Sequence, residues 1–332
     1  MGRMGRLALR AAWEREDLEI VALNDPAATP ESLALLLEFD SVQGRWQHAC
    51  SASSNEIQIG QARLPLGTHK RPEELPWKRW GVDLVLDCSG AFRSAELLQG
   101  HLQQGAQRVV VSAPVSGGPP NIVMGVNHQS YDLGSEPIVS AASCTTNCLA
   151  PIVRVLHDGI GIERGLVTTI HDPTNTQSVH DALHPDPRRA RASMLSLIPT
   201  STNSASAVAL IVPELAGKLD SIAVRAPVLN ASLCDCVFQV KREVDVERVN
   251  GLLEQASLGG PLKDILGYET RPLVSVDYAG DPRSAIVDAA STRVTDGLLV
   301  KVLAWYDNEW GYANRLIELA ARVAKETSRA HA

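Results

Sequence analysis

Strongly apolar runs alternate with helical stretches along the first part of the chain, and this alternation limits the fold more than any other feature. The runs at 82–87 and 108–112 are apolar throughout, and a stretch with helical spacing at 94–104 separates them. Strands of this kind belong to a parallel sheet that helices cover on both faces. We therefore predict an α/β domain, with further strands at 18–24, 122–124 and 137–140 and further helices at 5–15 and 31–39.

The pattern changes at about residue 165, where strand-like runs are separated by long polar loops. The sequence predicts a second, α+β domain with a mainly antiparallel sheet, and a C-terminal helix follows its last strand. A length of 332 residues is enough for about two domains. The predicted strands are 165–171, 222–228, 233–240, 272–278 and 298–306, and the helix is 307–325.

Composition narrows the class of protein. A net charge of −7 disfavours non-specific binding to nucleic acid. No apolar run is long enough for a bilayer span, and the first 15 residues lack the apolar stretch of a signal peptide. The six cysteines show no spacing typical of a metal site. We expect a protein of the reducing cytoplasm with no metal, no membrane partner and no nucleic-acid partner.

Cys144 follows a short strand and stands in the first turn of an apolar helix. Free backbone N–H groups and the helix dipole favour a thiolate at this position. The hydroxyl residues Ser143, Thr145 and Thr146 are of the capping type and are also suited to bind an anion. Pro151 should remove a hydrogen bond and kink the helix. The alternative is a buried cysteine among ordinary caps.

His171 ends an apolar strand, where its ring would emerge into a cleft. Alone it could be a structural histidine. Together with Cys144 it makes a nucleophile and a base.

Hydroxyl and basic side chains near these residues suggest an anion site. Thr174 follows His171 by three residues, and residues 199–203 form a hydroxyl-rich loop. Arg225 interrupts an apolar strand, where it binds either a ligand anion or a structural carboxylate. The basic turn at 188–191 is predicted to be a solvated surface.

The N-terminal residues resemble half of a phosphate-binding loop. Gly2 and Gly5 open a helix, and Asp25 follows about twenty residues later, where a ribose-binding carboxylate would stand. No strand precedes these glycines. We expect the first strand of a nucleotide-binding domain to lie upstream of Met1, where the start of translation would be assigned too late.

Six motifs are spread over nearly the whole chain, and together they resemble the phosphorylating glyceraldehyde-3-phosphate dehydrogenase family. They lie at 2–5, 24–26, 112–114, 124–127, 143–151 and 305–312, and the fifth and sixth are the most specific. The resemblance implies an NAD-binding Rossmann domain formed by 1–143 with 308–332. It also implies a catalytic domain formed by 144–307.

The resemblance implies that Cys144 is the nucleophile that attacks the aldehyde and that His171 is its base. After hydride transfer to NAD, inorganic phosphate would attack the thioester and give an acyl phosphate. Thr174 and Arg225 match the site for the phosphate of the substrate. The residues that match the site for the inorganic anion are Ser143, Thr145 and Thr202, with Asn203 standing where the family commonly has glycine.

The resemblance also implies a cofactor site. Gly2, Arg3 and Met4 match the phosphate loop, and Asp25 matches the contact to the adenosine ribose. Ser112 matches a contact near the nicotinamide ribose, and Asn308 matches the residue that bonds the carboxamide. Leu183 replaces a proline common in NAD-specific members, so NADP stays an alternative. Homotetramers are usual in the family.

Several departures resemble a subgroup associated with arsenic-resistance operons, among them the run Asp172–Gln177 after the histidine. Such an enzyme would use arsenate and form 1-arseno-3-phosphoglycerate. The segments 184–189 and 273–277 resemble erythrose-4-phosphate dehydrogenases instead. A third alternative is a non-catalytic paralogue, if the missing strand has spoiled the cofactor site.

Overall fold

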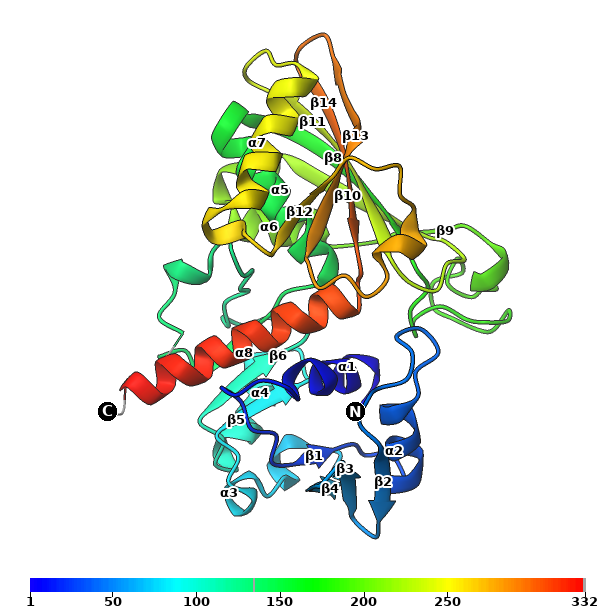
Figure 1. Cartoon of the computed structure of the whole chain (residues 1–332), viewed down its shortest axis with the longest axis vertical. Coiled ribbons are helices and arrows are strands. Elements are labelled where there is room, and N and C mark those ends of the chain that lie inside the picture. Colours follow the sequence, from blue (N-terminus) through cyan, green and yellow to red (C-terminus); the bar gives the residue numbers. More distant parts are fainter. Residues whose placement is uncertain (134, 331–332) are drawn as a thin grey trace. The chain divides into compact units, whose positions relative to one another are not determined.

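The computed structural model describes residues 1–133 and 135–330, which divide into two compact units (Figure 1). Unit 1 comprises residues 1–122, 128–142 and those from 313 onward, and unit 2 comprises 123–127 and 143–312. Compared with the predicted division at 143 and 308, unit 2 also takes Ser143, residues 123–127 and residues 308–312. In the described part of the chain, no helix is long and apolar enough to cross a membrane.

Unit 1 contains two separate β-sheets. The first has the order β1-β4-β3-β2, in which β1 pairs with β4 in parallel and the other pairs are antiparallel. The second is the parallel sheet β5-β6-β7. The strands are β1 (Leu23–Asn24), β2 (Cys50–Ser53), β3 (Glu56–Ile59), β4 (Ala62–Gly67), β5 (Leu84–Asp87), β6 (Arg108–Val111) and β7 (Ile138–Ser140).

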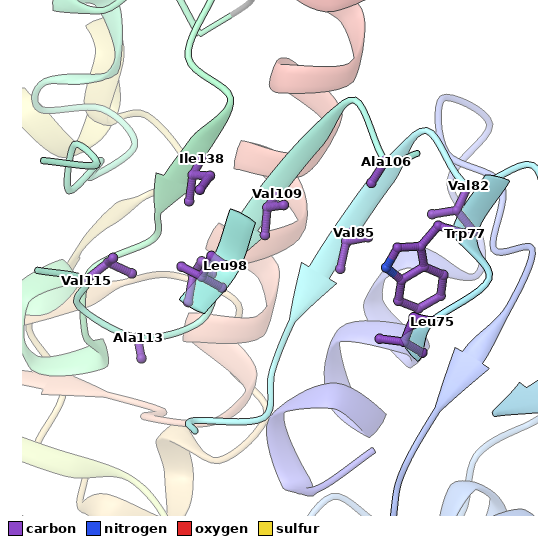
Figure 2. Close-up of a cluster of buried hydrophobic side chains, with 11 residues drawn as sticks. Leu75, Trp77, Val82, Val85, Leu98, Ala106, Val109, Ala113, Val115 and Ile138 are labelled. Carbon is purple, nitrogen blue, oxygen red and sulfur yellow. The ribbon is translucent and has the colours of Figure 1, made fainter. Parts of the chain in front are cut away.

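Helices pack on these sheets in two apolar clusters. One cluster includes Leu98 of α4 with Val85 and Val109 of the parallel sheet, all buried and all labelled in Figure 2. The other includes Leu37 of α2 and Ile57 of β3. The helices are α1 (Arg3–Ala12), α2 (Pro30–Glu38), α3 (Trp77–Trp80), α4 (Ala95–Gln103) and α8 (Trp310–Ala330), whose first residues belong to unit 2.

A cavity of about 450 Å³ lies between the two sheets of unit 1. Segment 20–25 lines one side of it and β5 lines the other. The predicted strand at 18–24 forms ladder pairs only at its last two residues. In this register the partner of Ala22 would be Pro65, which has no N–H to donate. On its other edge, no strand pairing joins β1 to β5 among the described residues, so the single parallel sheet that we predicted is two sheets.

Unit 2 contains one mixed sheet of seven strands in the order β12-β13-β14-β11-β8-β10-β9. Four of its pairs are antiparallel, and β10–β8 and β12–β13 are parallel. The strands are β8 (Ile162–His171), β9 (Ile198–Ser201), β10 (Leu219–Arg225), β11 (Ser232–Val240), β12 (Leu266–Glu269), β13 (Ala285–Thr295) and β14 (Leu299–Tyr306).

Three helices accompany this sheet, namely α5 (Cys144–Ile160), α6 (Ser204–Ile211) and α7 (Val246–Leu258). Helix α5 contacts β8, β11, β13 and β14, so the sheet supports the helix that carries Cys144 (Figure 1). Helix α5 continues through Pro151 to Ile160. In the sheet, the parallel register of β8 and β10 places His171 opposite Arg225.

Two predicted strands are wrong for the same physical reason. At 272–278 the chain forms a 3₁₀ turn, Ser275–Tyr278, and the backbone N–H of Val274 donates to Asp277 Oδ2 at 2.9 Å. At 122–124 the N–H of Val123 donates to Asn127 Oδ1 at 2.7 Å. In both places a nearby side chain accepts the hydrogen bond that a strand ladder would need.

Candidate active site

Cys144 and His171 lie together in unit 2. Helix α5 begins at Cys144 and β8 ends at His171, and their Sγ and Nε2 atoms are 3.6 Å apart. Ser143 is the N-cap of the helix, since its Oγ accepts the N–H of Thr146 at 3.1 Å. The thiol therefore lies at a capped helix N-terminus, where the helix dipole favours the thiolate.

The charge of His171 depends on its surroundings. Burial is the largest influence and lowers the pKa of the ring, but contacts with Asp172 and Cys144 outweigh it and raise the pKa to about 10. At neutral pH the ring is therefore an imidazolium beside the sulfur. A positive ring next to a cysteine sulfur favours the thiolate, which is the nucleophilic form of cysteine.

Arg225 lies next to His171 at the ends of the paired strands. Its Nη1 donates to the carbonyl oxygen of Asp172 at 2.8 Å, and the same atom is 2.8 Å from His171 Nδ1. Its Nε is buried and has no hydrogen-bond partner among the described residues. The guanidinium thus keeps a donor for a ligand, as an anion site requires.

Tyr306 joins two threonines next to His171. Its hydroxyl is 3.0 Å from Thr145 Oγ1 and 2.8 Å from Thr169 Oγ1, and its ring packs edge-on against His171. Burial raises the pKa of Tyr306 well above its usual value, so the hydroxyl keeps its proton. Thr145 is therefore held in place by a side chain from β14.

Replacing Tyr306 with phenylalanine should lower Tm by several degrees, because two buried threonine hydroxyls lose a partner at a cost of about 1–3 kcal/mol. Thermal unfolding would measure the loss. Tyr131→Phe is the matched control, since more than a third of Tyr131 is exposed to solvent. Equal unfolding temperatures for the two variants would contradict the prediction.

The hydroxyls of the predicted anion site make local bonds. Thr174 bonds Gln177 Oε1 through its N–H and its Oγ1, and Thr202 Oγ1 is 2.8 Å from Ser204 Oγ. Asn203 is exposed and precedes helix α6. Thr202 and Asn203 follow β9, which pairs with the strand of Arg225.

The predicted cofactor residues lie in both units. In unit 1, Gly2 is the N-cap of α1 without a side-chain cap, and Arg3 pairs with Asp40. Met4 lies in the first turn of the same helix, and Ser112 follows β6. In unit 2, Asn308 Oδ1 accepts a hydrogen bond from Ser232 at 2.9 Å.

Asp25 follows β1 and lines the same cavity as Gly2. Its carboxylate accepts bonds from the Met1 ammonium at 2.7 Å and from the N–H groups of Ala27 and Ala28. Burial raises the pKa of Asp25, but these bonds hold it below the usual value. A helix N-terminus and an ionised carboxylate at one cavity fit the phosphate and the ribose of a dinucleotide.

Three residues of the site were not predicted from the sequence. Asp172 places a carboxylate at His171, and Tyr306 holds Thr145. Arg189 was assigned to a solvated turn, yet it is half-buried, donates to Thr200 at 2.8 Å and lies near enough to Arg225 to lower its pKa. No pattern in the sequence distinguishes Arg189 from a solvent-exposed arginine, because its partner Thr200 comes close to it only in the folded chain.

Comparison with known proteins adds to this geometry. The family model described as "Glyceraldehyde 3-phosphate dehydrogenase, NAD binding domain" matches residues 1–95, and the corresponding C-terminal domain matches 143–308. A glyceraldehyde-3-phosphate dehydrogenase of Nostoc is 56% identical over 97% of this chain and 96% of its own length. Relatives from Pseudomonas aeruginosa and Geobacillus stearothermophilus, which carry the same name, are 48% and 46% identical over 97% and 98% of this chain, each along 96% of its own length.

Proposed function

Because the chain belongs to the glyceraldehyde-3-phosphate dehydrogenase family, we propose that it oxidises glyceraldehyde 3-phosphate to 1,3-bisphosphoglycerate through a thioester on Cys144. Membership of this family makes the chain an NAD-dependent oxidoreductase that acts on an aldehyde. We therefore do not propose that the chain is a non-catalytic paralogue. The observation that carries the proposal is the pair Cys144 Sγ and His171 Nε2, 3.6 Å apart, with the half-buried guanidinium of Arg225 on the other side of the ring.

The first step is addition of the Cys144 thiolate to the aldehyde carbon. The imidazolium of His171 donates its Nε2 proton toward the developing alkoxide, which gives a thiohemiacetal. In the oxidation the neutral ring then takes back the hydroxyl proton. NAD, when bound, supplies the acceptor for the hydride that leaves the substrate carbon.

The second step is attack on the thioester by an inorganic anion, with the Cys144 thiolate as leaving group. The N-terminus of α5 stabilises both this thiolate and the oxyanion. We assign the anion to the hydroxyls of Ser143, Thr145 and Thr202, with the exposed Asn203 beside them. The Ser143 hydroxyl would act here while it also caps α5.

Arg225 and Thr174 are assigned to the phosphate of the substrate. The buried Nε of Arg225 has no hydrogen-bond partner among the residues that the structure describes, and a phosphate oxygen would satisfy it. We assign Asp25 to the ribose of NAD and the start of α1, with Gly2, Arg3 and Met4, to its phosphates. Ser112 and Asn308 are assigned to the nicotinamide end. The carboxylate of Asp25 would repel the 2′-phosphate of NADP, which favours NAD.

Replacing Arg225 with leucine should lower the preference for glyceraldehyde 3-phosphate over glyceraldehyde by about 10²-fold, because a phosphate loses its charged partner. The ratio of kcat/KM values for the two aldehydes measures this preference. Arg293→Leu, at an exposed position of β13, should leave the ratio unchanged. An unchanged ratio in Arg225→Leu would remove the assignment.

The inorganic anion and the sugar phosphate that the enzyme oxidises are each tested by a separate measurement. The anion site would accept arsenate as well as phosphate, since the two ions share charge and shape. Initial rates with each anion test this, and no rate with arsenate would refute it.

Comparing kcat/KM for glyceraldehyde 3-phosphate and erythrose 4-phosphate decides the substrate, and a strong preference for erythrose 4-phosphate would overturn the proposal.

The assembly and the compartment are further parts of the proposal. By resemblance to the family, we propose a homotetramer that works in the cytoplasm. Light scattering on the purified protein measures the assembly, and a mass of one or two chains would contradict it. Cell fractionation would place the protein in its compartment.

A further inference from the structure

Asp172 presents a buried carboxylate to the ring of His171 on the side away from Cys144. Its Oδ1 lies 2.5 Å from His171 Nδ1, and its side chain is 4% exposed. We propose that Asp172 is a positioning residue that keeps His171 doubly protonated, so that the ring pairs with the Cys144 thiolate. The inference rests on the proposed function, in which His171 acts on the substrate of Cys144.

The carboxylate acts on the ring through its charge. The acceptor aligned with the ring nitrogen is the carbonyl oxygen of Asp172, at 2.9 Å from Nδ1. Oδ1 is closer but does not meet the alignment of a hydrogen bond. At this distance in a buried site, an unaligned carboxylate still stabilises a positive ring strongly.

Arg225 is the reason that His171 needs the negative charge of Asp172 to stay doubly protonated. Its Nη1 lies 2.8 Å from His171 Nδ1, so a guanidinium N–H faces the nitrogen that must carry a proton in the imidazolium. Two cations in contact would drive that proton off, and Nδ1 would then accept a hydrogen bond from Arg225. The Asp172 carboxylate opposes this repulsion and lets both cations exist side by side.

The other groups around the ring come from each neighbouring element. Cys144 faces Nε2 from α5, Tyr306 lies edge-on from β14, and Cys234 of β11 is near enough to interact electrostatically. Arg189 adds a second positive charge near Arg225. Against this positive charge, Asp172 places its carboxylate directly at the ring, and contacts with Asp172 and Cys144 raise the pKa of His171.

The ring can be titrated without any turnover. In Cys144→Ser the thiolate is gone, so a raised pKa of His171 must come from the protein around it. Nuclear magnetic resonance of the labelled ring should show His171 still protonated at pH 8 in this variant. A midpoint near the ordinary value of about 6.5 would overturn the proposal, and this result needs no change at Asp172.

Adding Asp172→Asn to Cys144→Ser should lower the midpoint of His171 by about one to three pH units. Asp158→Asn is the matched control, because it removes an exposed carboxylate on α5 about 21 Å along the helix from Cys144. The control should leave the midpoint in place. Equal midpoints with and without Asp172→Asn would also overturn the proposal.

Alkylation of Cys144 tests the consequence for the sulfur. With Cys144 present, Asp172→Asn should lower the rate of inactivation by iodoacetamide at pH 6 at least about tenfold, and Asp172→Glu should restore part of it. An unchanged rate in Asp172→Asn would count against the proposal. These readouts need neither substrate nor NAD, so the proposed function can fail while the role of Asp172 stands.

Discussion

Cys144→Ser is expected to lower kcat/KM for glyceraldehyde 3-phosphate at least about 10⁴-fold, because the thioester cannot form and the remaining groups provide only binding. The change removes one polarisable atom at the start of α5, so the unfolding temperature should stay within about a degree. Steady-state kinetics and thermal unfolding measure the two effects.

Cys50→Ser is the control for this variant. Cys50 is a half-buried thiol of unit 1, and burial together with Glu38 raises its pKa to about 11. It is therefore a protonated, unreactive thiol, and its replacement should leave kcat/KM unchanged. If Cys144→Ser kept more than a hundredth of the activity, a thioester on this residue could not be the route.

His171→Asn is expected to lower kcat about 10³-fold, since proton transfer by a positioned side chain contributes about 10²–10⁴-fold. The stabilisation of the Cys144 thiolate by His171 depends on pH. Since the folded pKa of His171 is raised to about 10, its stabilisation of the thiolate is present at neutral pH and is lost as the pH rises through about 10. In His171→Asn this stabilisation is absent at every pH.

The rate of alkylation of Cys144 between pH 5 and 10 reports this difference. The unchanged protein should react readily at pH 6, and His171→Asn should react only as the pH rises. His180→Asn, at an exposed position, should behave like the unchanged protein. Identical profiles for His171→Asn and the unchanged protein would show that the imidazolium does not hold the thiolate.

The sequence predicts those parts of the fold in which side chains determine the local structure. Apolar runs predict β5, β6 and β11, and the hydroxyl and cysteine residues at 143–145 predict the start of α5. The hairpins of β2, β3 and β4 were not predicted, although Gly60 stands at their second turn with φ of +57°. Their strands are short and polar on one face, so no apolar run marks them.

Residues of the site that depend on distant contacts could not be predicted from the sequence. The distance between Cys144 and His171 follows from the position of α5 on the sheet, and the place of Arg225 follows from the register of β8 and β10. Arg189 illustrates the limit best. Charge patterning alone assigns it to solvent, and only the fold brings it to Thr200.

The cavity in unit 1 has a consequence for how this unit unfolds. Among the described residues the two sheets share no ladder, and the cluster around Leu98 is separate from the cluster around Leu37, so we expect the two to be distinct cooperative groups. Side chains of segment 20–23 reach both, since Ile20 and Leu23 pack with the second cluster and Val21 and Ala22 with the first. Segment 20–23 is therefore one route of energetic coupling between the two clusters, and weakening its packing should let them unfold more independently.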